Sequence, residues 1–289
     1  MKRLSIFCAI LVAMLFATSC ADSGKKKAPK RYGWDNEEYG PLYGDIENVT
    51  ITYYDVVEKF GEIVKKKYCG KKVFNFNPKG DVIDNTFYNP DGSLRGKTLY
   101  KYDLLDNLIE EASYHSFFSW TDCKILYKYD SQGNLIEEVD YDSCGSLECK
   151  YLYKYDSQGN LIDRTFYDPD GSLRGKTLYE YDLLGNRIEQ AEYGSDGLLR
   201  RQYIYKYDSQ GNTIEMVCYN YGALSIKWIC KYNSQNNRVD KVWYKSNGSL
   251  KCQYLYKYDS HGNMIESIKY EGEIMKPTSM QVQEIVYRK

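Results

Sequence analysis

Apolar and polar residues alternate along short segments of the chain, and residues 147–155 (LECKYLYKY) show the pattern clearly. Their odd-numbered positions carry Leu, Cys and three Tyr, whereas the even-numbered positions carry Glu, Lys, Leu and Lys. A period of two residues is that of an extended chain, whose successive side chains point to opposite sides. The segment therefore predicts a β-strand with one aromatic face and one charged face.

The same pattern returns about every 26 residues over most of the chain. The motif Tyr-x-Tyr-Asp ends at Asp103, Asp130, Asp156, Asp182, Asp208 and Asp259, with Tyr232-Asn233 in the gap, in steps of 27, 26, 26, 26, 25 and 26 residues. A second series of tyrosines, offset by half a unit, runs from Tyr88 to Tyr270. Each unit thus holds two strands and two turns. Residues 86–105 recur almost unchanged at 165–184, which indicates internal duplication.

The turns are specified by their chemistry as well as by their spacing. Residues 89–92 (NPDG) and 130–133 (DSQG) place Pro or Ser second and Gly fourth. This order is typical of a type I turn followed by a left-handed residue, which joins neighbouring antiparallel strands. The sequence therefore predicts an all-β fold: an antiparallel meander of tandem β-hairpins, about 26 residues per two-strand unit, with roughly sixteen strands in a curled single-layer sheet.

Pairing the strands through these turns predicts a candidate ligand surface. Counting back from the turn at Asp130 places Tyr127 opposite Glu137, and the next turn places Glu137 opposite Tyr151. Rings and carboxylates in such rows can bind sugars. The candidate surface comprises Glu137, Tyr127, Tyr151, Asp163, Glu189 and Glu215. The alternative is a polar ladder that only specifies the repeat. Because the acid recurs in every unit, a single catalytic pair is not expected.

Composition narrows the functional classes. The chain of 289 residues has 32 Tyr but only 9 Phe and 4 Trp, which suits half-exposed β-strands. Lys and Arg total 39 against 40 Asp and Glu, so no net charge attracts nucleic acid. With two His, no metal site and no cofactor are expected. Cys123, Cys149 and Cys252 occupy equivalent positions in their units. Equivalent positions in neighbouring units are two strands apart, which is too far for a disulfide, so free thiols are expected.

The N-terminus has the pattern of an export signal. Lys2 and Arg3 precede an apolar run over 4–16, which is too short to span a bilayer as a mature helix. Residues 17–20 (ATSC) resemble the cleavage box of bacterial lipoproteins. The resemblance implies a signal peptide over 1–19, a lipid on Cys20 that anchors the protein in the cell envelope, at the outer membrane, and a basic tether over 20–48. An ordinary secretory signal remains the alternative.

The repeat itself resembles a known family. Residues 129–135 (YDSQGNL) and their copies are similar to the YD repeat of the RHS family, whose pattern is Tyr-Asp-x-x-Gly, a polar residue and Leu. Asp106 and Asn236 replace Gly in two units, and both tolerate the left-handed conformation. Large members build a curled β-shell around a toxin. The resemblance implies a small lipoprotein with a repeat array over 49–289 and no toxin domain, too short for a closed shell.

These observations together predict a function in binding. We expect a non-catalytic, lipid-anchored cell-envelope protein that presents a Tyr-rich β-surface to a protein or glycan partner. The alternatives are a secreted or surface carbohydrate-active enzyme, for which the sequence offers no evident site, and a structural spacer without a ligand.

Overall fold

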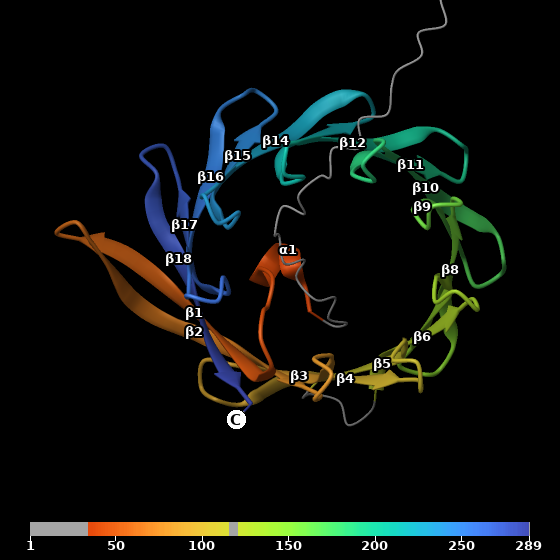
Figure 1. Ribbon diagram of the computed structural model, residues 1–289, viewed down its shortest axis with the longest axis horizontal. Helices are drawn as coiled ribbons and strands as arrows, with labels where there is room; N and C mark the ends of the chain where they lie inside the picture. Colours follow the sequence, from red (N-terminus) through yellow and green to blue (C-terminus); the bar gives the residue numbers. More distant parts are fainter. Residues whose placement is uncertain (1–33, 116–120, 289) are drawn as a thin grey trace, which may run out of the picture.

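The computed structural model describes residues 34–115 and 121–288, which form one short helix and a single antiparallel sheet (Figure 1). The elements are α1 (Asn36–Tyr39), β1 (Ile46–Lys59), β2 (Glu62–Phe76), β3 (Val82–Tyr88), β4 (Leu94–Tyr102), β5 (Leu108–His115), β6 (Thr121–Tyr129), β7 (Leu135–Asp142), β8 (Leu147–Tyr155), β9 (Leu161–Tyr167), β10 (Leu173–Tyr181), β11 (Arg187–Gly194), β12 (Leu199–Tyr207), β13 (Thr213–Asn220), β14 (Ala223–Tyr232), β15 (Arg238–Lys245), β16 (Leu250–Tyr258), β17 (Met264–Glu271) and β18 (Lys276–Tyr287). No helix in these described ranges is both long and apolar enough to cross a bilayer.

Every strand pairs with its neighbours in sequence, and the first strand also pairs with the last. β1 is hydrogen-bonded to β2 on one side and to β18 on the other, over Ile46 to Asp55. The 18-stranded sheet therefore closes into a barrel and leaves no free edge.

The all-β antiparallel meander is confirmed, and two details of the prediction are wrong. The sheet closes into a barrel where a curled open sheet was expected, and it has 18 strands where roughly sixteen were expected. Both errors have one cause. Residues 46–76 and 276–287 lack the repeat motif, yet they form the long strands β1, β2 and β18 that join the two ends of the array.

The predicted turn chemistry is confirmed. At the turn after Asp130, Gly133 N donates to Asp130 O and Asp130 N donates to Asn134 O, and Gly133 has a φ of 82°. Asp106 and Asn236, which replace Gly, each have a φ of 64°. The left-handed position is thus kept both where the residue is Gly and in the two turns where Asp106 or Asn236 replaces it.

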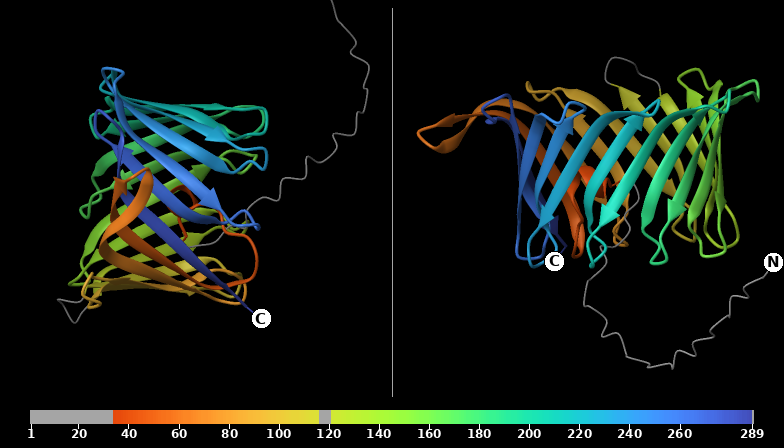
Figure 2. Two further views of the ribbon diagram at one scale, coloured as in Figure 1. Left: turned by 90° about the vertical axis from the view of Figure 1, so that its left-hand side faces the viewer. Right: turned by 90° about the horizontal axis from the view of Figure 1, so that it is seen from above.

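The turns that follow the Tyr-Asp motifs all lie at one end of the barrel, which we call the YD mouth; the other end is the far mouth (Figure 2). The chain enters β1 and leaves β18 at the YD mouth, where Arg288 N donates to Asp45 O. The β1–β2 hairpin projects beyond the far mouth, because these strands are 14 and 15 residues long.

The segment before β1 lies inside the barrel. Trp34, Tyr39 and Leu42 are buried against Phe74 and Phe76 of β2, and together they form the largest apolar cluster of the described residues. The expected boundary between a solvated tether and the array, at residues 48 and 49, is therefore misplaced. From Trp34 onward the chain is packed in the lumen because its aromatic residues gain burial there.

Candidate ligand site in the barrel lumen

The buried N-terminal segment identifies which face of the wall is the inner one. Trp34 and Tyr39 lie within the ring, and their side-chain rings contact Phe74 at centroid distances of 4.9 and 5.5 Å. Phe74 therefore points inward, as does its cross-strand partner Asn85. Asn85 Nδ2 donates to Tyr100 Oη at 2.7 Å, which continues the inner face onto β4. Because directly paired residues lie on the same face of a sheet, the strand pairing identifies the inward residues of the remaining strands.

The tyrosine of each Tyr-Asp motif ties one hairpin to the previous one. Tyr129 Oη donates to Leu108 O at 2.8 Å, and Tyr155 Oη donates to Leu135 O at 2.9 Å. The same bond is made by Tyr102, Tyr181, Tyr207, Tyr232 and Tyr258. Each hydroxyl satisfies the carbonyl of the first residue of an odd-numbered strand, from β3 to β15, next to a β-bulge. The motif tyrosine is thus a structural residue.

The β-bulge beside each YD turn shifts the strand pairing by one residue. Lys128 pairs with Glu137, and the register changes immediately after Lys128. Tyr127 and Tyr151 are both opposite Glu138. The predicted pairing of Glu137 with the two tyrosines is therefore wrong, because a slip of one residue moves a side chain to the other face of a sheet.

The four carboxylates of the predicted surface lie on the outer face, and two of them, Glu137 and Glu215, bridge lysines. Glu137 accepts from Lys128 Nζ and Lys150 Nζ, both at 2.5 Å. Equivalent bridges join Glu110 to Lys101 and Lys124, and Glu215 to Lys206 and Lys227. Two candidates have neutral partners: Asp163 accepts from Thr165 Oγ1 at 2.6 Å and Glu189 accepts from Gln202 Nε2 at 2.8 Å. Of the six predicted residues, only Tyr127 and Tyr151 face the lumen.

A second set of carboxylates lines the lumen over β5–β7, and we call it the acidic wall: Glu111, Glu138 and Asp140. Glu111 accepts from Tyr127 Oη at 2.9 Å, and Glu138 accepts from Tyr153 Oη. Burial raises the pKa of both glutamates. The signal for the two glutamates in the sequence is weak, because each directly follows an acid that points outward and the bulge decides which of the two points inward.

One arginine closes the acidic wall on the β9 side. The Arg164 guanidinium stacks on the Tyr151 ring at 4.0 Å and lies 3.9 Å from Glu138 Oε1. Tyr151 also stacks in parallel on Phe166, with a centroid distance of 4.5 Å. A planar cation between rings is a favourable arrangement in a partly desolvated wall.

Strands β14 and β15 lie across the lumen from β5 and β6 (Figure 1). Trp228 of β14 and Trp243 of β15 face one another at 6.5 Å, and Lys241 Nζ lies 4.5 and 5.0 Å from their ring centroids. Among the described residues, the buried Trp243 Nε1 has no hydrogen-bond partner. We call Trp228, Trp243 and Lys241 the aromatic wall.

A cavity of about 990 Å³ lies where residues 40–44 cross the YD mouth. Side-chain amides of Asn212, Asn236 and Asn237 line it together with Arg238 and Tyr258. Residues 40–44 are fixed by Asn263, whose Oδ1 accepts from Tyr43 N at 2.6 Å and whose Nδ2 donates to Tyr43 O at 3.1 Å. The lumen is therefore partly covered at this mouth.

The seven cysteines of the described residues are all free thiols. Burial raises the pKa of the Cys149 thiol to about 11, and its Sγ donates to Asp140 Oδ2 at 3.2 Å. A thiol with so high a pKa is a poor nucleophile.

Comparisons with known proteins give distant likenesses. No protein-family model matches the chain, and no curated protein matches it. A porin-like protein from Bacteroides uniformis is 11% identical, with 85% of this chain and all of that chain covered at a TM-score of 0.43. A porin-like protein from Bacteroides vulgatus is 14% identical, with 84% and 99% covered at a TM-score of 0.22. A TcdB2-TccC3-Cdc42 structure is 13% identical, with 75% of this chain and 16% of that chain covered at a TM-score of 0.23.

These findings correct the expected family. The chain was expected to be an RHS-type YD-repeat protein with an open array, but no family model supports this and the sheet closes into a barrel. Two of the structures that are covered almost completely are described as porin-like. TM-scores below 0.5 do not establish a shared fold, so the architecture rests on the strand pairing of this chain.

Proposed function

We propose that this protein is a non-catalytic, lipid-anchored barrel of the cell envelope that binds a glycan in its lumen. The observation that carries the proposal is the inner surface, where the aromatic wall lies opposite the acidic wall. Indole and phenol rings stack on the apolar faces of sugars, and carboxylates accept hydrogen bonds from sugar hydroxyls.

The inner position of these groups favours a glycan over a folded protein partner. An 18-stranded barrel is wide enough for an aqueous lumen, and residues 34–45 occupy only part of it. An extended sugar chain fits such a lumen, whereas a folded domain would contact only the rims. The hydroxyls of Tyr127 and Tyr153 donate to carboxylates of the acidic wall. This satisfies the polar end of each side chain and leaves the ring face for stacking.

The outer face supports a barrel that stands in water beside the membrane. Glutamates bridged by lysines run around the wall. Lys128, Lys206 and Lys257, near the YD mouth, are each about two thirds exposed, and the bridging lysines Lys124, Lys150 and Lys227 lie midway along their strands. A lysine on the lipid face of a spanning barrel costs about 2–4 kcal/mol at the bilayer midplane. The wall carries many such residues, so we assign membrane attachment to a lipid on Cys20.

The test is a panel of envelope and host glycans, with tryptophan fluorescence as the readout. Trp243→Leu changes the aromatic wall, whereas Tyr244→Leu changes the next residue, which pairs with Lys227 on the outer face. We expect the first variant to weaken binding at least tenfold, about 1.4 kcal/mol, and the second to change it less than twofold. Equal effects would contradict a lumenal site. A panel without any ligand would favour the spacer, and product formation would favour an enzyme.

A further inference from the structure

Two turns at the YD mouth differ from the others. Most turns of this series carry Ser followed by Gln or His, but residues 103–107 and 182–186 carry Leu-Leu. Leu104 and Leu105 are 100% and 81% exposed, and Leu183 and Leu184 are 104% and 86% exposed. Single exposed apolar residues are common, but two fully exposed pairs at one end of a molecule are characteristic of a contact surface. We call these four residues the leucine tips.

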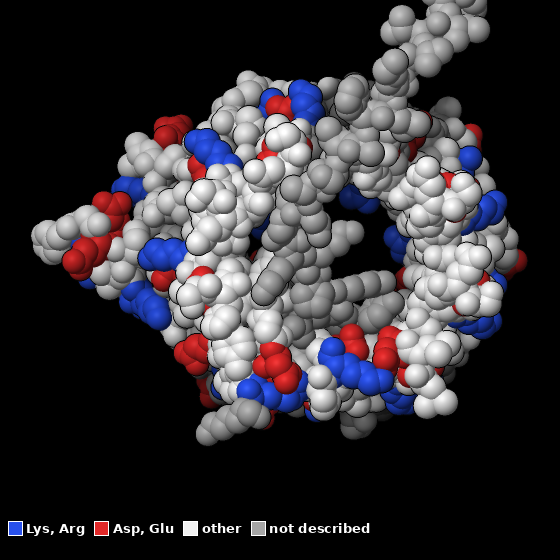
Figure 3. All heavy atoms as spheres, in the orientation of Figure 1, with Lys and Arg blue, Asp and Glu red and all other residues white. Residues whose placement is uncertain are grey.

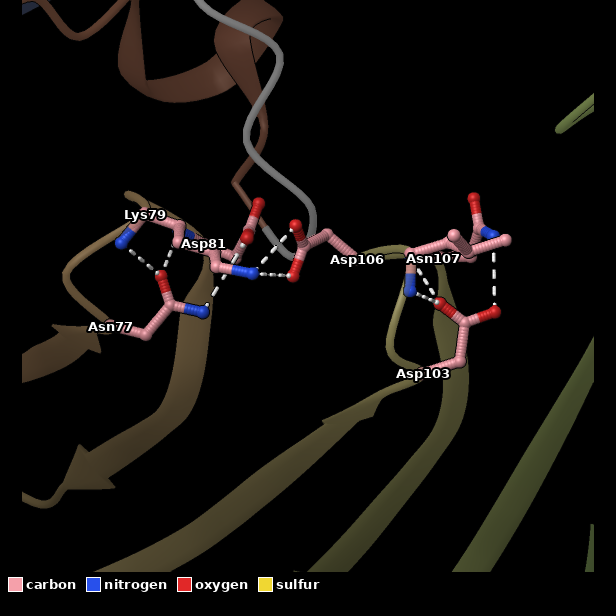
Figure 4. Close-up of polar contacts among 7 residues, drawn as sticks. Asn77, Lys79, Asp81, Asp103, Asp106 and Asn107 are labelled. Carbon is pink, nitrogen blue, oxygen red and sulfur yellow. Dashed lines mark hydrogen bonds and ion pairs between the residues drawn. The ribbon is translucent and has the colours of Figure 1, made fainter.

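Hydrogen bonds to the first Asp fix the backbone of both turns, and Figure 4 shows them for the first turn. Asp103 Oδ1 accepts from Leu105 N at 2.8 Å and from Asn107 N at 2.9 Å. Lys79 Nζ donates to both carboxylate oxygens of Asp106, at 2.6 and 2.8 Å. Asp182 makes the same backbone contacts in the second turn. The charges beside the tips are thus already partnered, which lowers the cost of bringing them to another surface.

The tips are spaced around the mouth. Eight turns, together with the seam where β1 begins and β18 ends, divide the YD mouth into nine steps. The two Leu-Leu turns are the second and the fifth, and the turn whose Asn263 holds residues 40–44 is the eighth. Three features therefore lie at equal intervals around the ring. Figure 3 looks onto this mouth: charged side chains gather on the rim over β3–β5 and on the outer wall, and the rest of the rim is mostly uncharged.

The N-terminal chain reaches the barrel at the same mouth. Trp34 contacts Phe74 and Phe76, which are within the last three residues of β2 before the YD mouth. Thirteen residues lie between Cys20 and Trp34, and the chain from Cys20 to Trp34 spans at most about 50 Å when extended. A lipid on Cys20 would therefore hold this end of the barrel close to the bilayer.

We propose that the leucine tips insert into the surface of the bilayer to which Cys20 is anchored, so that the YD mouth faces the membrane and the far mouth opens away from it. The inference rests on the proposed lipid anchor. Leucines inserted at the headgroup boundary gain burial of their side chains. Two separated tips and the tether resist tilting of the barrel, which would keep the lumen accessible from the far mouth.

The experiment uses the mature, lipidated protein in phosphatidylcholine vesicles with brominated acyl chains. Leu183→Trp places a reporter on a tip, and Leu198→Trp places a matched reporter on an exposed turn at the far mouth. We expect the added emission at residue 183 to be quenched at least twofold and that at residue 198 to be unquenched. Hydrogen exchange on the unmodified protein should slow at 103–107 and 182–186 when vesicles are added, and not at 194–198.

The outcomes separate the tips from the anchor, since acylation of Cys20 is read independently by mass spectrometry. Acylated protein that floats with vesicles but shows no quenching at residue 183 would overturn the tip contact and leave the anchor standing. Quenching at residue 183 in unacylated protein would support the tip contact without the anchor. Protein that stays in solution, or equal quenching at both positions, overturns the tip contact.

Discussion

Glu137 and Glu138 are adjacent in sequence but lie on opposite faces of β7, so replacing each by Gln gives a direct test of the strand register. Gln keeps the size and the acceptor oxygen of Glu but removes its charge. On the outer face, Glu137 accepts from Lys128 and Lys150 at 2.5 Å. On the inner face, Glu138 accepts from Tyr153 and lies beside Arg164.

For Glu137 the expected loss follows from the two lysine bridges. The Lys128 and Lys150 side chains are 68% and 38% exposed, and exposed ion pairs contribute about 0.2–1 kcal/mol each. Glu137→Gln should therefore lower the free energy of unfolding by about 1 kcal/mol at neutral pH. The lysine hydrogen bonds lower the pKa of Glu137, so this contribution is present above its unfolded pKa and is lost as pH falls through the folded one.

For Glu138 the contribution to stability changes with pH in the opposite direction. Burial raises its pKa, so the group favours the folded state most below its unfolded pKa, and this contribution is lost as pH rises through the folded value. A neutral Gln carries no charge to desolvate and still accepts from Tyr153. Glu138→Gln should therefore be at least as stable as the parent at pH 7, with an advantage that shrinks in acid.

The assay is urea unfolding followed by tryptophan emission between pH 3.5 and 8, with thermal melts in parallel. In a chain of this size, 1 kcal/mol corresponds to about 2–4 °C in Tm. Equal losses for the two variants at pH 7 would refute the assigned faces. A deficit of Glu137→Gln that does not shrink as the pH falls through the lowered folded pKa of Glu137 would refute the ion-pair explanation.

Three further predictions concern the turns, the hairpin contacts and the anchor. Tyr155→Phe leaves Leu135 O without its donor and should cost about 1–3 kcal/mol in unfolding free energy, whereas Tyr167→Phe on the outer face should cost less; similar losses would contradict a special role for the motif tyrosine. Gly159 has a φ of 83°, so Gly159→Val should cost about 1–3 kcal/mol and Gly159→Asn much less; equal melting temperatures would argue against the left-handed turn. Cys20→Ala should abolish incorporation of labelled fatty acid, and label retained in the variant would exclude Cys20 as the attachment site.

The turns could be predicted from sequence because their chemistry is local. Gly133 and its equivalents need a positive φ, and Asp130 bonds atoms no more than four residues away. Register is less local, since it depends on where the chain inserts the extra residue of a bulge. Counting from Asp130 without that residue turns Glu137 inward and Glu138 outward, which reverses both rows. The predicted pairing of Glu137 with Tyr127 and Tyr151 was wrong for this reason.

Closure could not be predicted from the repeat, because curvature adds up over many strands and depends on small angles in each. The structure places the fully buried apolar residues near the closing strands: Ile46, Val49 and Ile51 of β1 are 0% exposed, and Phe74 of β2 is 1% exposed. Elsewhere the wall is held by cross-strand pairs, by tyrosine hydroxyls and by a smaller apolar cluster around Trp228. The repeat therefore supplies the curvature, and the parts of the chain that lack the repeat supply the core that fixes the ring at 18 strands.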